Sequence, residues 1–211
     1  MKIISLKPAA RKMARVHDNK STLYVDEGGL ETIDKTFAAQ LQKQGLEIIP
    51  QQGDGNCLFR AVSLQVYGDA NMHDQVRNSC MDHMAQDPDH FGPFVADGES
   101  YDEYINRKRQ LGCHGNNAEV QAISELFNRP VHIYTPQSGS KPLNIFHGNY
   151  KTEDAPIRLS YHDGNHYNAI VDPLVPTAGV GLGLPGMLTP LDVDQRQVAQ
   201  AVTESDILAD E

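Results

Sequence analysis

The stretch QQGDGNCLFRAV, residues 51–62, places a cysteine behind an Asp-Gly-Asn turn and in front of an apolar run. Apolar side chains fall on one side of a helix that we predict over residues 57–67, at Leu58, Phe59, Val62 and Val66. Cys57 stands at the first turn of this helix, where unpaired N–H groups and the positive end of the helix dipole lie. It is either a small core residue behind a helix capped by Asp54, or a nucleophile presented to a substrate.

The second interpretation requires a base, because a catalytic cysteine reacts as a thiolate. We expect this base to be His166, on the second strand of a hairpin over residues 156–171. Side chains alternate along a strand, so Asn168 shares a face with His166, can accept from one ring nitrogen and leaves the other for the thiol. Cys–His–Asn is one variant of the catalytic triad. His162 is the second candidate for the base, but Gly164, two residues further on, provides no orienting side chain.

The other histidines and cysteines form weaker patterns. Three histidines lie on or beside exposed helix turns and are expected to be solvated. These are His73, His83 and His90. The adjacent residues Cys113 and His114 rarely reach one tetrahedral metal together, and no further ligands cluster with them, so we predict no metal site. Cys80 recurs with Val76 and Met84 at four-residue intervals, which indicates a core thiol.

Helices dominate the first two thirds of the chain and strands the last third, an order typical of an α+β fold. The predicted helices cover residues 31–45, 57–67, 72–86 and 116–130, with two shorter pieces around Gly98. The predicted strands cover residues 46–50, 131–135 and 143–146 and the hairpin. We expect the strands of the last third to form an antiparallel meander. Asn116 and Glu119 have the spacing of a capping box.

The composition limits the classes of function. The chain has 18 Lys and Arg against 28 Asp and Glu, and a net charge of -10 argues against a nucleic-acid-binding protein. Three widely spaced cysteines indicate neither a disulfide framework nor a zinc knuckle. The N-terminus lacks the apolar region of a secretory signal, and no apolar run is long enough for a membrane span. We therefore expect a soluble protein of the cytoplasm, the nucleus or both.

Two blocks, GDGNCLFRAV at 53–62 and GNHYNAIV at 164–171, together resemble the ovarian-tumour (OTU) family of cysteine deubiquitinases. Further segments are similar to the subfamily that contains OTU domain-containing protein 5 and its plant relatives: VYGD, YINRKR, GNNAEVQA, FNRPVHIY, IFHGNY and PIRLSYHDGNHYN. The resemblance runs from Leu46 to Pro173. It implies the papain-like OTU fold, in which helices pack around a small central, mostly antiparallel sheet.

The resemblance also implies roles for single residues. Cys57 matches the nucleophile and His166 the general base, while Asn168 matches the position that orients the histidine. Asp54 matches an acidic residue that is counted in the family's active site. It is therefore a catalytic residue, a cap and loop anchor, or both. The backbone N–H groups of residues 55–57 are the expected oxyanion donors.

By this resemblance the chain is a deubiquitinase that hydrolyses the isopeptide bond after the C-terminal glycine of ubiquitin. Its implied partners are ubiquitin, polyubiquitin chains and ubiquitinated proteins, with no cofactor and no metal, and we expect a monomer. Two alternatives stay open. One is a hydrolase of the same fold that acts on another ubiquitin-like modifier, and the other is a catalytically idle ubiquitin-binding adaptor.

These observations divide the chain into three segments. Residues 1–30 are expected to form a flexible basic arm, and residues 31–175 the OTU catalytic domain. Residues 176–211 combine a Gly-rich linker with an acidic tail. The tail carries the spacing of a ubiquitin-interacting motif from Val198 through Ala201 to Ser205, although an ordinary solvated acidic tail accounts for it as well.

Overall fold

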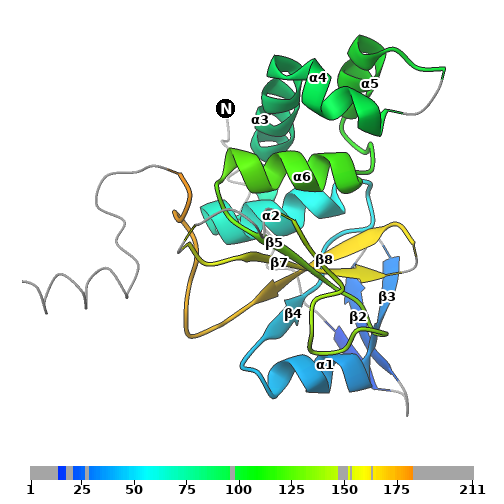
Figure 1. Cartoon of the computed structure of the whole chain (residues 1–211). Coiled ribbons are helices and arrows are strands. Elements are labelled where there is room, and N and C mark those ends of the chain that lie inside the picture. Colours follow the sequence, from blue (N-terminus) through cyan, green and yellow to red (C-terminus); the bar gives the residue numbers. More distant parts are fainter. Residues whose placement is uncertain are drawn as a thin grey trace, which may run out of the picture.

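The computed structural model describes residues 14–17, 21–26, 29–95, 98–146, 152, 154–162 and 164–182, with side chains from Asp34 onward. In this part of the chain the strands form two sheets (Figure 1). The first is antiparallel and has the order β1-β2-β3, with β1 at Ala14–His17, β2 at Ser21–Asp26 and β3 at Gly29–Asp34.

The second sheet has five strands and positions the site residues. Its order is β4 (Glu47–Ile49), β8 (His166–Val171), β7 (Ile157–His162), β5 (Val131–Tyr134) and β6 (Asn144–Phe146). The helices are α1 (Lys35–Gln42), α2 (Cys57–Tyr67), α3 (His73–Gln86), α4 (Pro88–Phe91), α5 (Tyr101–Lys108) and α6 (Asn117–Leu126), with 3-10 turns η1 (Ala70–Met72) and η2 (Gly92–Phe94). The helix predicted over residues 57–67 is confirmed with these bounds.

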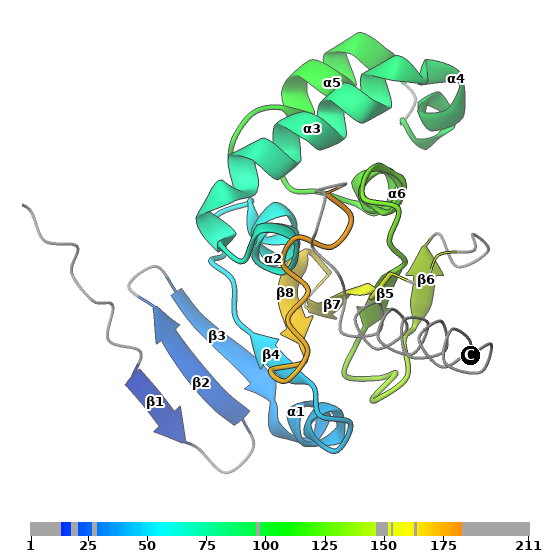
Figure 2. The same ribbon diagram turned by 90° about the vertical axis from the view of Figure 1, so that its left-hand side faces the viewer.

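Helices cover both faces of the five-stranded sheet (Figures 1 and 2). α2 and α6 pack on one face, where the strand residues Ile157 and Leu159 are fully buried. On the other face, Phe37 of α1 forms a smaller cluster with Ile170 and its neighbours. α3, α4 and α5 lie outside α2 and α6, on the side away from the sheet. The first residue of α2 therefore reaches the turn between β7 and β8, where Cys57 contacts that turn.

The strand order corrects the expected antiparallel meander. β5 pairs with β7 in parallel, whereas the β4–β8, β7–β8 and β5–β6 pairs are antiparallel. The mostly antiparallel sheet is thus confirmed, but the sequential arrangement of the strands is wrong. β6 is short and exposed and takes the edge, while the more buried β7 lies on the inner side of β5.

The segment before α1 differs from the expected flexible arm. Its described residues form β1 to β3, and β3 extends to Asp34. The helix expected from residue 31 therefore begins at Lys35, where the Asp34 side chain accepts a hydrogen bond of 2.9 Å from the Phe37 N–H. Thr32 and Ile33 are β-branched and favour the extended backbone before this cap.

The Gly-rich segment after β8, expected to be a linker, is packed against α2 as far as residue 182. Thr177 Oγ1 donates to the Gln65 carbonyl at 2.9 Å, and the Gly179 N–H donates to the Val66 carbonyl at 2.7 Å. These carbonyls belong to the last turn of α2, where carbonyl groups lack partners within the helix. The rest of the predicted tail, including residues 198–205, lies outside the described residues.

Arg129 holds the same end of α2 from inside the protein. This side chain is fully buried and donates to the carbonyls of Gln65, Ala155 and Val180 at 3.3, 2.6 and 3.4 Å. Burial lowers the pKa of Arg129 to about 10, so the guanidinium stays charged at neutral pH. One side chain thus joins α2, the loop before β7 and the segment that follows β8.

We expect a chain that ends at residue 175 to be less stable than one that ends at residue 182. The longer chain keeps Thr177, Gly179 and Val180, whose hydrogen bonds to α2 and Arg129 contribute about 2 kcal/mol together. Urea unfolding of both chains, followed by circular dichroism at neutral pH, measures the difference. Equal unfolding midpoints would show that the segment adds nothing to the stability of the helical layer.

Candidate active site

Cys57, the candidate nucleophile, is the first residue of α2 and is 1% exposed. Asn56 occupies the N-cap position, and its side chain makes no capping hydrogen bond. The expected cap by Asp54 is wrong, because Asp54 Oδ1 accepts instead from the Asn56 N–H at 3.0 Å. Asp54 thus closes a turn immediately before the helix and leaves the first turn of α2 uncapped.

His166 and Asn168 are joined as the strand alternation predicts, and their contact determines the tautomer of the histidine. His166 Nε2 lies 3.0 Å from Asn168 Oδ1, and the Gln51 N–H donates to the same oxygen at 2.7 Å. A backbone N–H can only donate, so the Asn168 atom that faces it is the amide oxygen. His166 Nε2 must then carry the proton that it donates. In the neutral ring, His166 Nδ1 is therefore the basic nitrogen.

The thiol lies at the turn between β7 and β8, which leads into His166. Cys57 Sγ lies 3.9 Å from the carbonyl oxygen of Asn165, the residue before His166, and donates a weak hydrogen bond to it. Asn168 is fully buried behind the histidine. The structure therefore brings Cys57, His166 and Asn168 to one place, although α2 and β8 are far apart in the sequence.

The loop before α2 offers fewer oxyanion donors than expected. The Asn56 N–H is bonded to Asp54, which removes it from the set predicted over residues 55–57. The N–H groups of Gly55 and Cys57 donate to no acceptor within the described part of the chain. These two groups are the donors available to a negative charge that develops beside the thiol.

Asp54 makes the contacts of a loop anchor. Its Oδ2 accepts from Arg60 Nη2 at 2.7 Å and from Arg60 Nε at 3.1 Å, while its other oxygen holds Asn56. Burial alone would raise the pKa of Asp54, but the hydrogen bonds from Arg60 and Asn56 outweigh burial and lower the pKa to about 2. Asp54 therefore ties the loop to the second turn of α2 as a carboxylate. A direct part in the reaction stays a prediction.

Residues that no sequence pattern indicated hold this loop from its other side. Asn56 Oδ1 accepts from Arg77 Nη2 and from the Gly112 N–H, both at 2.8 Å. Gly55 has a φ of +77°, and a Cβ there would lie 1.9 Å from the Gly112 carbonyl oxygen, so only glycine fits. The local signal for this close approach is the pair of glycines in GCHG at 112–115.

His162, the second candidate for the base, has an orienting partner that the sequence analysis did not foresee. Its Nε2 lies 2.8 Å from Ser160 Oγ, and its ring meets the Phe37 ring edge-on with centroids 6.1 Å apart. His162 pairs with His166 across β7 and β8, so both histidines stand on one face of the sheet. The thiol, however, contacts Asn165, directly beside His166. This contact favours His166 as the base.

His90 is exposed, as expected, whereas His83 is partly buried, and both histidines are bound to one carboxylate that the sequence pattern does not indicate. Nε2 of each lies against the Glu125 carboxylate, at 3.2 and 3.0 Å, and the pair joins α3 and α4 to α6. Burial would raise the pKa of Glu125, but hydrogen bonds from Gln121, His90 and His83 lower it. These histidines have a structural contact that helical periodicity does not indicate.

The remaining cysteines have separate environments. Cys80 is fully buried and burial raises its pKa, which confirms the predicted core thiol. Cys113 is partly buried, and Arg107 Nη1 donates to its sulfur at 3.6 Å. Within the described ranges, no three metal-ligating side chains form a group that could hold an ion. In the same ranges, no helix has the length and apolar character needed to cross a bilayer.

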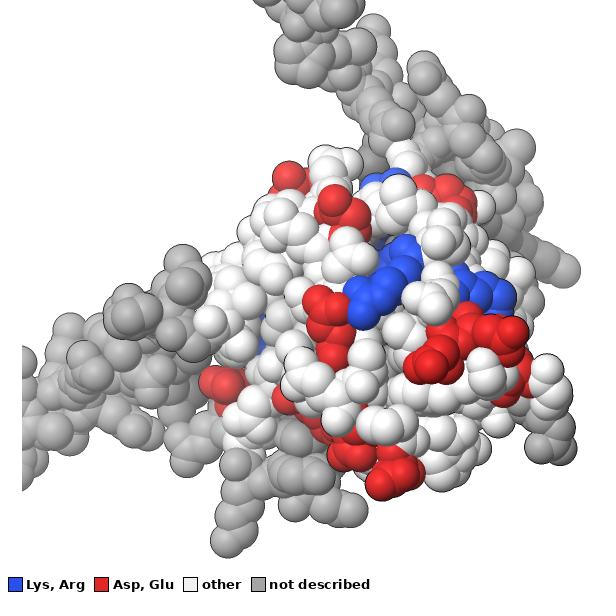
Figure 3. All heavy atoms as spheres, turned by 90° about the horizontal axis from the view of Figure 1, so that it is seen from above, with Lys and Arg blue, Asp and Glu red and all other residues white. Residues whose placement is uncertain are grey.

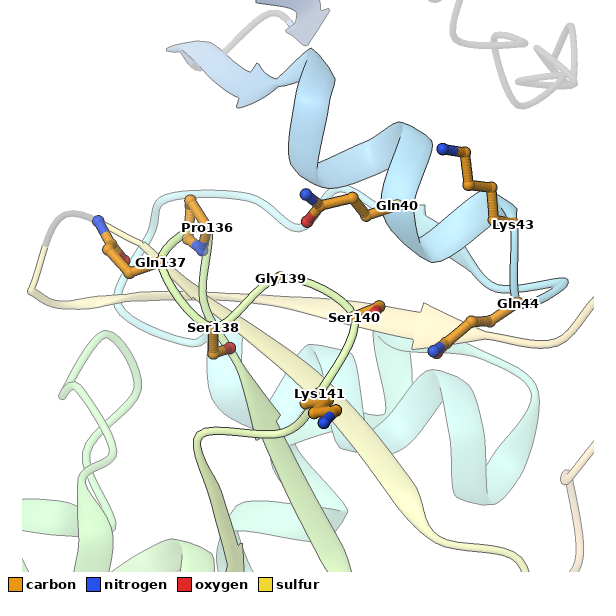
Figure 4. Close-up of a pocket in the computed structure, with 9 residues that line it drawn as sticks. All are labelled: Gln40, Lys43, Gln44, Pro136, Gln137, Ser138, Gly139, Ser140 and Lys141. Atoms are coloured by element: carbon orange, nitrogen blue, oxygen red, sulfur yellow. The ribbon is translucent and has the colours of Figure 1, made fainter.

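A shallow depression of about 580 Å³ lies between α1 and the loop after β5 (Figure 4). It is lined by Gln40, Lys43, Gln44 and residues 136–141, and none of these is a predicted site residue. On the face above α3 to α5, basic side chains lie close to acidic ones (Figure 3). Arg107–Glu99 and Arg109–Asp82 are ion pairs with 2.7 and 2.6 Å between their closest atoms, so much of this charge is neutralised locally.

Comparison with family models matches residues 52–167 to the OTU-like cysteine proteases. The matched range contains Asp54, Cys57 and His166 and ends one residue before Asn168. Among solved structures, the OTUD1 OTU domain is similar with a TM-score of 0.58 and 28% identity, over 65% of this chain and 93% of that chain. An OTU domain in complex with ubiquitin is similar in fold, with a TM-score of 0.50 and 19% identity over 60% of this chain and 69% of that chain.

Curated relatives include the OVARIAN TUMOR DOMAIN-containing deubiquitinating enzyme 6 of Arabidopsis thaliana, which is 49% identical over 175 residues. That alignment covers 82% of this chain and 34% of the relative. OTU domain-containing protein 5-A of Danio rerio is 45% identical over 192 residues, which cover 90% of this chain and 33% of that protein. The chain thus spans about a third of the length of these relatives.

Asp54→Asn should lower the free energy of unfolding by about 1 kcal/mol at neutral pH, because it removes a solvent-screened charge pair with Arg60. The folded-state pKa of Asp54 is about 2, below its ordinary value of 3.8. A lowered pKa stabilises the fold above the ordinary value, and the stabilisation is lost as the pH falls toward 2. The difference between wild type and variant should therefore shrink over that interval in urea titrations at fixed pH.

A difference that stays constant through this pH interval would contradict the loop-anchor interpretation. The same variant also addresses the alternative role of Asp54. A turnover number that falls further than in Arg60→Ala would indicate a direct part in the reaction, because Arg60→Ala removes the same ion pair and keeps the carboxylate.

Proposed function

The chain belongs to the family of OTU-like cysteine proteases, and from this membership we propose that it is a deubiquitinase. Its proposed reaction is hydrolysis of the isopeptide bond between the C-terminal glycine of ubiquitin and a lysine, in polyubiquitin chains or ubiquitinated proteins. The observation that carries the proposal is the arrangement of Cys57, His166 and Asn168, in which Asn168 Oδ1 orients His166 and the Cys57 thiol contacts the residue directly before that histidine. The proposed reaction uses no cofactor and no metal.

In the first half of the reaction, Cys57 Sγ forms a bond to the carbonyl carbon of the ubiquitin glycine, and His166 Nδ1 takes the thiol proton. Negative charge develops on the former carbonyl oxygen, where the Gly55 and Cys57 N–H groups serve as donors. The carbon–nitrogen bond then breaks. His166 returns its proton to the leaving lysine amine, and a thioester remains on Cys57.

In the second half, a water molecule attacks the thioester carbon and passes a proton to His166 Nδ1. The carbon–sulfur bond breaks, the proton goes back to Cys57, and ubiquitin leaves with a free carboxyl group. Asn168 accepts from His166 Nε2 in every step, so the ring keeps its orientation while its charge changes. The thiol proton, which now points to the Asn165 carbonyl, has to turn to His166 Nδ1 before it is transferred.

The names of similar proteins support ubiquitin as the modifier. The Arabidopsis relative is a deubiquitinating enzyme, and an OTU domain of the same fold was solved in complex with ubiquitin. A hydrolase for another ubiquitin-like modifier would use the same three residues, so this alternative remains. A catalytically idle adaptor is disfavoured, because binding alone has no need for a histidine whose basic nitrogen is set by a buried amide.

Further partners and the location are proposed on composition and spacing. We place the protein in the cytoplasm, the nucleus or both, as a monomer. The segment from Val198 to Ser205 is proposed as a second ubiquitin contact, with an ordinary acidic tail as its alternative.

A ubiquitin probe with a C-terminal thiol-reactive group should form a covalent adduct with the wild-type chain, detected as a mass increase. Cys57→Ala should abolish the adduct, whereas Cys113→Ser should not, because Cys113 lies in the neighbouring loop and takes no part in the reaction. An adduct that persists in Cys57→Ala would overturn the assignment of the nucleophile. Parallel probes built on ubiquitin-like modifiers distinguish the alternative hydrolase, which would react with one of those and not with ubiquitin.

Asn168→Ala should lower kcat by about 10- to 100-fold, because it removes the acceptor that orients His166 and holds Gln51. Asn168→Asp keeps that acceptor and should retain most of the activity. The added carboxylate stabilises the imidazolium form of His166, and His166 must be unprotonated to take the thiol proton, so the acid limb of the rate–pH profile should move to higher pH. Cleavage of ubiquitin that carries a C-terminal fluorogenic amide measures both effects. Equal rates for Asn168→Ala and wild type would remove Asn168 from the mechanism.

A further inference from the structure

Arg77, on α3, is fully buried and lies directly beneath the loop that leads to Cys57. Its Nη2 donates to the Gly55 carbonyl at 3.3 Å and to Asn56 Oδ1 at 2.8 Å. Its Nη1 donates to the Lys108 carbonyl at 2.8 Å. Two of these acceptors therefore belong to the nucleophile loop, residues 53–57, and the third to the end of α5.

Burying the Arg77 guanidinium costs desolvation free energy. Each of the acceptors above is neutral, and Arg77 Nε has no partner among the described atoms. A buried guanidinium without a carboxylate partner and with one N–H unsatisfied carries a desolvation cost that hydrogen bonds to neutral acceptors offset only in part. The guanidinium also lies 4.0 Å from the centroid of the Phe59 ring, which sets its plane. These features indicate that Arg77 serves to orient the backbone groups to which it donates.

The contacts of Arg77 decide how the loop backbone faces the thiol. Holding the Gly55 carbonyl fixes the plane of the peptide between Gly55 and Asn56. The N–H of that peptide is already bonded to Asp54. The Asn56 side chain is shared with the Gly112 N–H at 2.8 Å, so the loop cannot rotate about its own axis without breaking several bonds. Fixing this peptide restricts the rotation of the peptides before and after it, which carry the N–H groups of Gly55 and Cys57.

Arg77 is itself held by a rigid part of the protein. Lys108, whose carbonyl it bonds, has its ammonium group 3.1 Å from Glu119 and 2.7 Å from the His114 carbonyl. Glu119 accepts in turn from the Asn116 N–H in the capping box of α6 and from the Tyr104 hydroxyl. Through Arg77, this buried cluster connects α5 and α6 to the nucleophile loop.

We propose that Arg77 is a positioning residue for the nucleophile. Through the Gly55 carbonyl and the Asn56 side chain, it holds the loop so that the Gly55 and Cys57 N–H groups face the reacting carbonyl oxygen. The inference rests on the proposed function, because that function supplies the oxygen on which charge develops. Arg77 touches neither substrate nor reacting atoms in this proposal and acts only through the loop.

The test uses the full chain with Arg77→Lys, Asn56→Ala and the double variant. Arg77→Lys keeps the charge and loses the fork of donors, and Asn56→Ala breaks the same contact without touching the buried cation. Arg129→Lys is the matched control, because Arg129 is also a buried arginine bonded to carbonyls, but at the far end of α2. Kinetics are measured with ubiquitin carrying a C-terminal fluorogenic amide and are corrected for the folded fraction.

We expect Arg77→Lys and Asn56→Ala each to lower kcat by about 10- to 100-fold while KM stays within about 3-fold, because only the positioning of the reacting groups changes. The double variant should lose little more than either single variant, since both act through one contact. Arg129→Lys should keep kcat despite lower stability. Unchanged kcat in Arg77→Lys and Asn56→Ala, or an equal loss in Arg129→Lys, would overturn the proposal.

A second measurement separates this inference from the proposed function. The rate at which iodoacetamide alkylates Cys57 is followed against pH by mass spectrometry, and it needs no ubiquitin. The rate profile should move to higher pH in Arg77→Lys and Asn56→Ala but not in Arg129→Lys, because misdirected N–H groups stabilise the thiolate less. If wild type fails to cleave the ubiquitin substrate, the proposed function fails, and this profile still decides the role of Arg77. Identical profiles in all variants would count against that role.

Discussion

The amide oxygen of Asn168 accepts two hydrogen bonds at once, and the geometry of the site depends on this double contact. One donor is the Gln51 N–H at 2.7 Å, in the segment between β4 and α2, and the other is His166 Nε2 at 3.0 Å. The first contact places the chain that leads to the nucleophile, and the second orients the base. Since the backbone donor identifies the oxygen, the same residue also decides which ring nitrogen of His166 is basic.

The side-chain amide of Asn56 makes the same kind of double contact at the other end of the nucleophile loop. Asn56 Oδ1 also accepts two donors, Arg77 from α3 and the Gly112 N–H from the loop between α5 and α6. The loop is therefore fastened to the sheet through Asn168 and to the helical layer through Asn56. Asp54 adds a third contact, to Arg60 on α2, and connects the loop to the helix that it precedes.

The sequence predicted the elements whose signals are local. The bounds of α2 and the capping box of α6 follow from apolar spacing and cap residues, which lie within a few positions of one another. The contact between His166 and Asn168 follows from strand alternation, and the OTU resemblance connected it with Cys57. Each of these inferences needed only neighbouring residues or a known motif.

The elements that were missed depend on contacts between distant segments. The parallel pairing of β5 with β7 requires knowing that β6 takes the sheet edge, and periodicity contains no such information. Arg77 appears in the sequence as one arginine in an amphipathic helix, and only the packing of α3 under the nucleophile loop gives it a purpose. Gly112 likewise has a role only because Gly55 approaches it closely.

Hydrophobic burial does not define the loop before α2. Residues 51–56, QQGDGN, contain no apolar side chain, whereas Leu58 and Phe59 immediately after them are fully buried. Burial is non-directional and scales with apolar area, so it holds α2 against the sheet but leaves the preceding loop undefined. Directional hydrogen bonds from two asparagines and one buried arginine define it instead, and the pattern of apolar residues contains no information on these bonds.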